Sequence, residues 1–149
     1  MIGCEWTDVA HGGVIAARTC PPKIPRATTP VAAWSAIAQA HIDQAHAEGG
    51  AFVLNHPTWA LFPWVLTVSD FDAIEVWNSF WAIGDIGLHP VTPRSLQDRL
   101  DSEGFTAAGV APGPEIAAVP NVPGSGNEQA LFYWEAFLEQ GRRVAAVGG

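Results

Sequence analysis

Apolar residues recur at helical spacing between Pro30 and Gly49. Thr29 followed by Pro30 predicts a helix start with Thr29 as the N-cap, and the glycine pair that begins at Gly49 predicts the helix end. The apolar face of this helix, which includes one histidine, consists of Trp34, Ile37, Ala38, His41 and Ala45. We therefore expect the helix to pack on a sheet through this face.

Short apolar runs on both sides of this helix predict strands. The runs 3–7 and 13–17 flank a turn at His11, Gly12 and Gly13, so they are expected to form two neighbouring strands. Further runs with few polar residues, typical of strands buried under helices, lie at 51–54, 73–77 and 144–147.

Two more helices are predicted in the second half of the chain. One begins at Thr92 and Pro93, carries Leu96 and Leu100, and ends at Gly104. The other is capped by Asn127 and runs through Leu131, Trp134 and Leu138 to Gly141. Residues 107–126 are rich in Pro and Gly and are expected to form a long loop. The alternation of strands and helices predicts an α/β fold with parallel strands and outer helices, either a barrel or an open sheet.

Composition narrows the class of protein. The net charge is −8 and 48% of the residues are hydrophobic, which argues for a folded domain and against a basic surface that binds nucleic acid. No apolar run is long enough to span a membrane and no signal peptide is visible, so a soluble protein is expected. Cys4 and Cys20 can form at most one disulfide, and they leave the compartment open.

Candidate chemistry gathers at the predicted strand ends. Glu5 lies in the first strand, His11 follows it, and His56 follows the strand at 51–54. In parallel α/β proteins, ligands bind at the carboxyl ends of strands. One Glu and two His can hold a divalent metal and leave a coordination position for water, which is typical of a catalytic site. The remaining histidines, for which no chemistry is expected, are His41, His46 and His89.

Four blocks of sequence, in order, carry a family resemblance. They are Gly-Cys-Glu-Trp-Thr at 3–7 with His11 and Gly12, Val-Leu-Asn-His-Pro at 53–57, Ile-Glu-Val-Trp-Asn at 74–78, and the segment 134–149 that ends in Gly-Gly. This pattern resembles the PHP superfamily of metal-dependent phosphoesterases, and most of all its branch of carbaryl-hydrolase-like metallohydrolases.

The resemblance implies a distorted (β/α) barrel with two or three metal ions at one mouth. It assigns Glu5 as a metal-bridging carboxylate and His11 and His56 as metal ligands. The implied activity is hydrolysis of a small-molecule phosphate or other ester by metal-bound water, with zinc, manganese or iron as the cofactor.

Three family motifs, at the two ends of the family pattern, have no counterpart in this sequence. The family opens with His-x-His and a later Asp-His, and it closes with Ser-Asp-x-His after a Gly-Gly such as Gly148 and Gly149. Residues 1–149 are therefore expected to be the middle portion of a PHP-type barrel, truncated at both ends, with exposed sheet edges along 3–7 or 144–147. Such a chain would be poorly stable, would bind one ion loosely and would show little turnover. The alternative function is a catalytically silent folded fragment or interaction piece.

Residues beside the three candidate ligands have open roles. Asn55, Glu75, Asn78 and Trp77 are candidates for the pocket or for support of the ligands. Glu75 could equally pair with a neighbouring Arg or accept hydrogen bonds from backbone. Four tryptophans either line a pocket for an aromatic or apolar substrate, cover the barrel mouth, or would pack against missing strands: Trp59, Trp64, Trp77 and Trp81.

Overall fold

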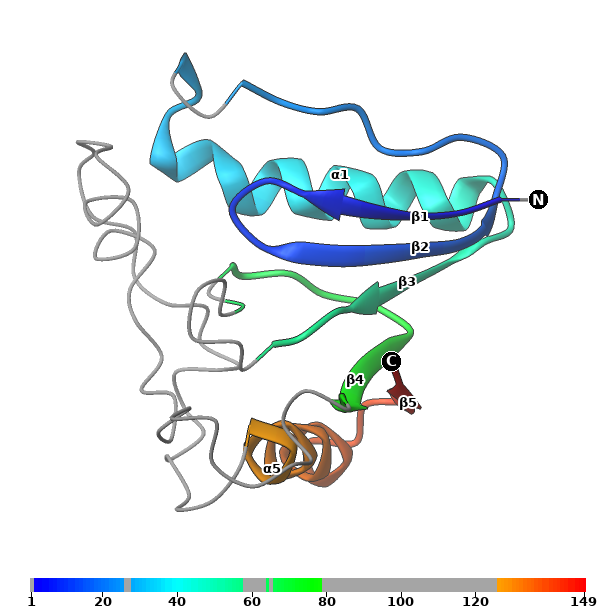
Figure 1. Cartoon of the computed structure of the whole chain (residues 1–149), viewed down its shortest axis with the longest axis vertical. Helices are drawn as coiled ribbons and strands as arrows, with labels where there is room; N and C mark the ends of the chain where they lie inside the picture. The colour runs from blue at the N-terminus through cyan, green and yellow to red at the C-terminus, as the bar shows by residue number, and fades with distance from the viewer. Residues whose placement is uncertain (1, 26–27, 58–63, 65, 79–125) are drawn as a thin grey trace.

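The computed structural model of the chain describes residues 2–25, 28–57, 64, 66–78 and 126–149 (Figure 1). Over these residues the fold is mixed α/β, with one open five-stranded sheet and two α-helices. The strands are β1 (Ile2–Thr7), β2 (His11–Ala17), β3 (Ala51–Leu54), β4 (Ala73–Trp77) and β5 (Ala145–Gly148), and the helices are α1 (Trp34–Ala47) and α5 (Gly126–Glu139). The predicted helix at Thr92–Gly104 and the predicted loop, up to residue 125, lie outside the described residues.

The strands follow one another in sequence order across the sheet, β1-β2-β3-β4-β5. The pairs β3-β4 and β4-β5 are parallel, as the alternation of strands and helices predicts. The pairs β1-β2 and β2-β3 are antiparallel, so the expectation of parallel pairing is wrong for the first strands. A connection as short as the one between β1 and β2 allows only an antiparallel hairpin. The described strands form an open sheet whose edges are β1 and β5.

The hairpin turn lies earlier than its glycines indicate. The register pairs Thr7 with His11, so the turn is Asp8–Ala10 and the sequence His11–Gly13 belongs to β2. The Trp6 indole Nε1 donates to Asp8 Oδ2 at 2.7 Å, and Val9 and Ala10 are fully buried. This burial fixes the turn and makes His11 the first residue of β2.

Helix α1 ends as expected but begins later. Thr29 Oγ1 donates to the Pro25 carbonyl at 2.7 Å, and a 3₁₀ turn at Val31–Ala33 precedes the helix, so Thr29 is not the N-cap. Gly49 has a φ of 78°, which allows the Gly50 N–H to reach the Ala45 carbonyl at 2.8 Å. The buried face agrees with the predicted one except that Ile37 is half-buried and Ile42 is buried: Trp34, Ala38, His41, Ile42 and Ala45.

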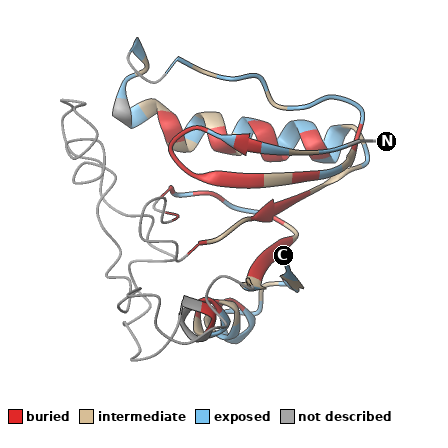
Figure 2. Cartoon of the chain, in the orientation of Figure 1, coloured by how far each residue is buried: buried red, intermediate tan, exposed pale blue. Residues whose placement is uncertain are grey.

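Both helices contribute to one hydrophobic core, and its strand residues pair across one face of the sheet. Figure 2 shows the buried stretches of the helices and strands in red. Sheet residues such as Phe52 and Ile74 point into this core. The buried residues of α5 are Asn127, Ala130, Tyr133 and Phe137, whereas Leu131 and Leu138 are exposed. Asn127, predicted as the N-cap, is the second residue of α5, and its side chain bonds to the backbone of Asn78. In the described part of the chain, neither helix has the length and apolarity needed to cross a bilayer.

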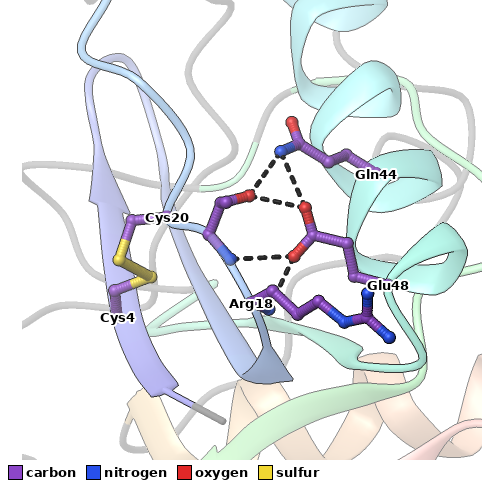
Figure 3. Close-up of a disulfide and its surroundings, with 6 residues drawn as sticks. Cys4, Arg18, Cys20, Gln44 and Glu48 are labelled. Atoms are coloured by element: carbon purple, nitrogen blue, oxygen red, sulfur yellow. Dashed lines mark hydrogen bonds between the residues drawn. A yellow bond between two sulfur atoms is a disulfide. The ribbon is translucent and has the colours of Figure 1, made fainter.

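A disulfide and a carboxylate fasten the segment after β2 (Figure 3). Cys4 on β1 is bonded to Cys20, with the two Cα atoms 6.0 Å apart. Glu48, at the end of α1, accepts hydrogen bonds from the backbone N–H groups of Arg18 and Thr19 at 2.6 and 2.8 Å. The edge strand β1 is thus tied covalently to a segment that α1 holds in place.

Removing the disulfide is expected to lower the free energy of unfolding by about 3 kcal/mol. Closing a loop of about 15 residues lowers the conformational entropy of the unfolded chain, and this raises its free energy by that amount. The sequence separation of Cys4 and Cys20 is 16. The measurement is urea unfolding of the C4S/C20S double variant beside the oxidised wild type. As a control, adding a dithiol reductant should destabilise the wild type and leave the double variant unchanged. Equal midpoints for the wild type and the double variant would contradict the prediction.

The Glu48 carboxylate gives the stability a pH dependence at acid pH. Hydrogen bonds from the Thr19 hydroxyl, the Gln44 amide and the Thr19 N–H lower the pKa of Glu48 from 4.5 to about 2. Because the pKa of Glu48 is lower in the folded protein than in the unfolded chain, the ionised carboxylate stabilises the fold at pH values above its ordinary pKa of 4.5. This stabilisation is lost as the pH falls towards 2. Glu48→Gln should therefore lower the melting temperature at pH 7 and have a much smaller effect near pH 2, where about half of the Glu48 carboxyl is protonated in the folded state. Glu139→Gln, at the exposed end of α5, is the control; a deficit of E48Q that is undiminished at pH 2 would refute the assignment.

Candidate metal centre

Glu5 and His11 come together through the register of the hairpin. Glu5 pairs with Gly13, and His11 lies two positions before Gly13 on β2, so both side chains emerge on the same face of the sheet. That face is opposite to the core. Glu5 Oε1 lies 3.2 Å from His11 Nδ1, and the His11 side chain is buried whereas Glu5 remains accessible.

His56 reaches the same carboxylate from the end of β3. The backbone N–H of Asn55 donates to the His11 carbonyl at 3.0 Å, which places His56 beside β2. His56 Nε2 lies 3.3 Å from Glu5 Oε1. Pro57 predicts an extended conformation at His56, but the residue has a left-handed φ of 43°. Its backbone N–H donates to Glu75 Oε2 at 2.7 Å, and this bond holds the turn that aims the ring at Glu5.

Glu75 lies on β4 and is buried behind His56. Its Oε2 also contacts His56 Nδ1, and its Oε1 accepts a hydrogen bond from Asn78 Nδ2 at 2.9 Å. Of the roles left open by the sequence, the structure shows that Glu75 accepts a backbone hydrogen bond and contacts the ring of the candidate ligand His56. Glu75 and Asn78 therefore support the His56 ring.

The carboxylates of Glu75 and Glu5, which flank His56, both raise the pKa of its ring. The hydrogen bond to Glu75 raises the pKa of His56 against the opposing effect of burial, and the charge of Glu5 adds to the increase. Burial by itself would raise the pKa of Glu75, but hydrogen bonds from His56 and Asn78 outweigh it, so the pKa of this carboxyl lies below its ordinary value. The site thus favours positive charge between Glu5 and Glu75.

The geometry fits a divalent cation. One ligand atom from each of Glu5, His11 and His56 lies within 4.8 Å of the others, so the three residues converge as predicted. A tetrahedral cation with bonds of about 2.0–2.2 Å separates its ligand atoms by roughly 3.3–3.6 Å, close to the two carboxylate-to-imidazole distances. These three residues could hold a metal ion; which metal, and whether it binds, stays a prediction.

An open cavity of about 650 Å³ lies over this face of the sheet. Glu5, His56 and Glu75 line it together with apolar side chains of β2, β3 and β5. Glycines keep the space around the polar side chains: a Cβ atom at Gly13 would press on the Asn55 amide. The sequence alone does not indicate that a glycine is needed at position 13, because the side chain for which it makes room comes from the end of a neighbouring strand.

The two other histidines within the described residues, His41 and His46, lie apart from the cluster. His41 is buried against the Trp6 ring with centroids 5.1 Å apart, and burial lowers its pKa. His46 is exposed, and its Nε2 lies 2.8 Å from Asp72 Oδ2, which joins α1 to the start of β4. Both therefore have the structural roles expected of helix residues. His89 lies outside the described residues.

Of the four tryptophans, the two within the described residues, Trp64 and Trp77, are not among the residues that line the cavity. Trp64 is fully buried in the core, where its Nε1 donates to the Leu66 carbonyl at 3.1 Å. Trp77 is 55% exposed beside β5 and is not among the residues that line this cavity, so its role in a substrate pocket stays a prediction. Trp59 and Trp81 lie outside the described residues.

Asn127, which its sequence position predicts as a helix N-cap, instead supports Asn78. Its Oδ1 accepts from the Asn78 N–H at 2.8 Å and its Nδ2 donates to the Asn78 carbonyl at 3.1 Å. An Asn at the start of a helix is usually a cap, so no local signal could have revealed this contact with β4. Comparisons with protein-family models, curated proteins and solved structures gave no match for this chain.

Proposed function

We propose that this chain is a metal-dependent hydrolase of phosphoesters or related esters, with a divalent cation held by Glu5, His11 and His56. The observation that carries the proposal is the meeting of one carboxylate oxygen with two imidazole rings from different strands. Three protein ligands leave a coordination position for water, as in catalytic rather than structural zinc sites. Zinc, manganese and iron all accept this combination of oxygen and nitrogen donors.

In this proposal, the side chains of the chain bind the cation and hold one another in position for it. Asn55 Nδ2 donates to Glu5 Oε1 at 3.1 Å, which holds the carboxylate towards the two rings. The second oxygen of Glu5 gives it the capacity to bridge to another cation, as the PHP resemblance implies. A divalent cation, when bound, supplies the Lewis acidity that activates water and polarises an ester.

The cavity supports a small-molecule substrate. Its volume of about 650 Å³ lies within the range of ligand pockets. Its walls include Ile15, Val53 and Val147, and the Glu and His side chains gather at one place on its surface. An ester with an apolar group beside the scissile bond fits this distribution of apolar and polar side chains.

We also propose that the sheet is part of a PHP-type barrel. Support comes from the parallel pairs β3-β4 and β4-β5, from the helices on the opposite face to the cluster, and from the ordered sequence blocks that bring Glu5, His11 and His56 together.

Metal binding followed by an activity screen tests the proposed function. We expect isothermal titration of the chelator-treated chain to give one zinc or manganese ion per chain. We expect slow, metal-dependent hydrolysis of nitrophenyl phosphate, carboxylate or carbamate esters that the Glu5→Gln variant lacks. Absence of binding at millimolar metal would refute the metal site.

The alternative function is a catalytically silent fragment or interaction piece, and the same experiment separates it from a hydrolase. Binding of one ion without hydrolysis of any ester, also after the reading frame has been extended in both directions, would favour the silent protein. Finding His-x-His upstream and Ser-Asp-x-His downstream would favour the hydrolase.

A further inference from the structure

We infer that Glu75 is a positioning residue that fixes the His56 ring with its proton on Nδ1, so that Nε2 is the atom presented to a metal ion. This inference rests on the proposed function for its use, because only a bound cation needs the Nε2 lone pair. The tautomer itself is a property of the protein with or without a cation, so it can be tested separately.

The proton assignment follows from the acceptors around the ring. An ionised carboxylate can only accept hydrogen bonds, and Glu75 Oε2 faces both the backbone N–H and the Nδ1 of His56. Nδ1 must therefore donate. Asn78 Nδ2 also lies 3.4 Å from Nδ1, but its shorter bond, 2.9 Å, goes to Glu75 Oε1. Glu75 is thus the stronger partner of Nδ1.

Glu75 is itself held from both sides, which suits a positioning role. Asn78 occupies its Oε1, and the backbone of Asn78 is bonded in turn to the Asn127 side chain of α5. Glu75 is also buried, 3% exposed, so solvent has little access to its oxygens. A chain of hydrogen bonds therefore runs from α5 through β4 to the His56 ring.

The opposite side of the ring faces the candidate ligands. Nε2 lies 3.3 Å from Glu5 Oε1, another atom that only accepts when ionised. A neutral ring with its proton on Nδ1 directs the Nε2 lone pair to the place where Glu5 and His11 meet. Histidine ligands of metals commonly donate their other N–H to a carboxylate, which fixes the ring orientation and increases ligand basicity.

The experiment is long-range proton–nitrogen NMR of the histidine rings in the full, chelator-treated chain, at a pH at which the same spectra show His56 neutral. We expect the wild type to carry the proton on Nδ1. Glu75→Gln should shift His56 towards the other tautomer and weaken zinc binding by roughly 10–100-fold, as for other outer partners of metal ligands. Glu5→Gln, the matched control, should lose zinc and keep the Nδ1 proton.

Each outcome decides the inference. A wild-type ring with its proton on Nε2 overturns it, and so does an E75Q variant with unchanged tautomer and zinc affinity. If E75Q does not fold, the wild-type spectrum decides by itself. If the wild type binds no zinc but carries the Nδ1 proton, the proposed function fails while the orientation of His56 by Glu75 stands.

Discussion

Replacing Glu5 with Gln is expected to weaken zinc binding by more than the roughly 10–100-fold that loss of an outer partner costs. Glu5 Oε1 is the atom that both imidazole rings approach, at 3.2 and 3.3 Å. The substitution removes the negative charge that offsets the cation and makes one ligand atom an amide nitrogen, which does not bind zinc. The measurement is competition for zinc with a chromophoric chelator at fixed pH.

Glu139→Gln is the matched control for the change in net charge, because Glu139 is exposed at the end of α5. It should leave zinc affinity within about twofold of the wild type, since screened surface charges far from a site contribute little. If E5Q and E139Q bind zinc equally well, the ion is bound elsewhere and the assignment of Glu5 is wrong.

Phe137→Ala is expected to cost about 3–5 kcal/mol of unfolding free energy, the usual range for truncation of a buried aromatic side chain. Phe137 is fully buried and its ring lies edge-on to Phe71 with centroids 5.3 Å apart. The Arg142 guanidinium carbon lies 4.9 Å from the same ring, so its contact is lost as well. Urea unfolding monitored by tryptophan fluorescence gives the change.

The adjacent residue on α5 provides the control. Leu138 is 42% exposed, so Leu138→Ala should cost less than about 1 kcal/mol. If L138A proves the more destabilising of the two, the helix packs through the leucine positions that the sequence emphasises, and the orientation of α5 described here is wrong.

The sequence predicts the strands most accurately where the local pattern of apolar and polar residues determines their bounds. The uncharged run Ala51–Leu54 between a glycine pair and Asn55 gives β3 at its observed bounds, and Ala73–Trp77 does the same for β4. The convergence of Glu5, His11 and His56 was also predicted, but for a different reason: the register of the antiparallel hairpin, not the meeting of parallel strand ends, brings Glu5 and His11 together.

Contacts between distant segments could not be read from the sequence. The left-handed backbone of His56 depends on Glu75, and the true role of Asn127 depends on Asn78. The buried face of α5 includes Tyr133 and Phe137 rather than Leu131, because aromatic side chains fill the space over β4. In each case a tertiary partner overrides the local preference of the residue.

The antiparallel hairpin gives the candidate ligands an order of assembly during folding. Glu5 and His11 belong to β1 and β2, which pair across a three-residue turn, whereas His56 joins them only after α1 and β3 have docked on β2. Local pairs form faster than pairs separated by long stretches of chain. A cation held by all three side chains, as proposed, would therefore bind after the slow, long-range step, and it would act by retarding unfolding more than by accelerating folding.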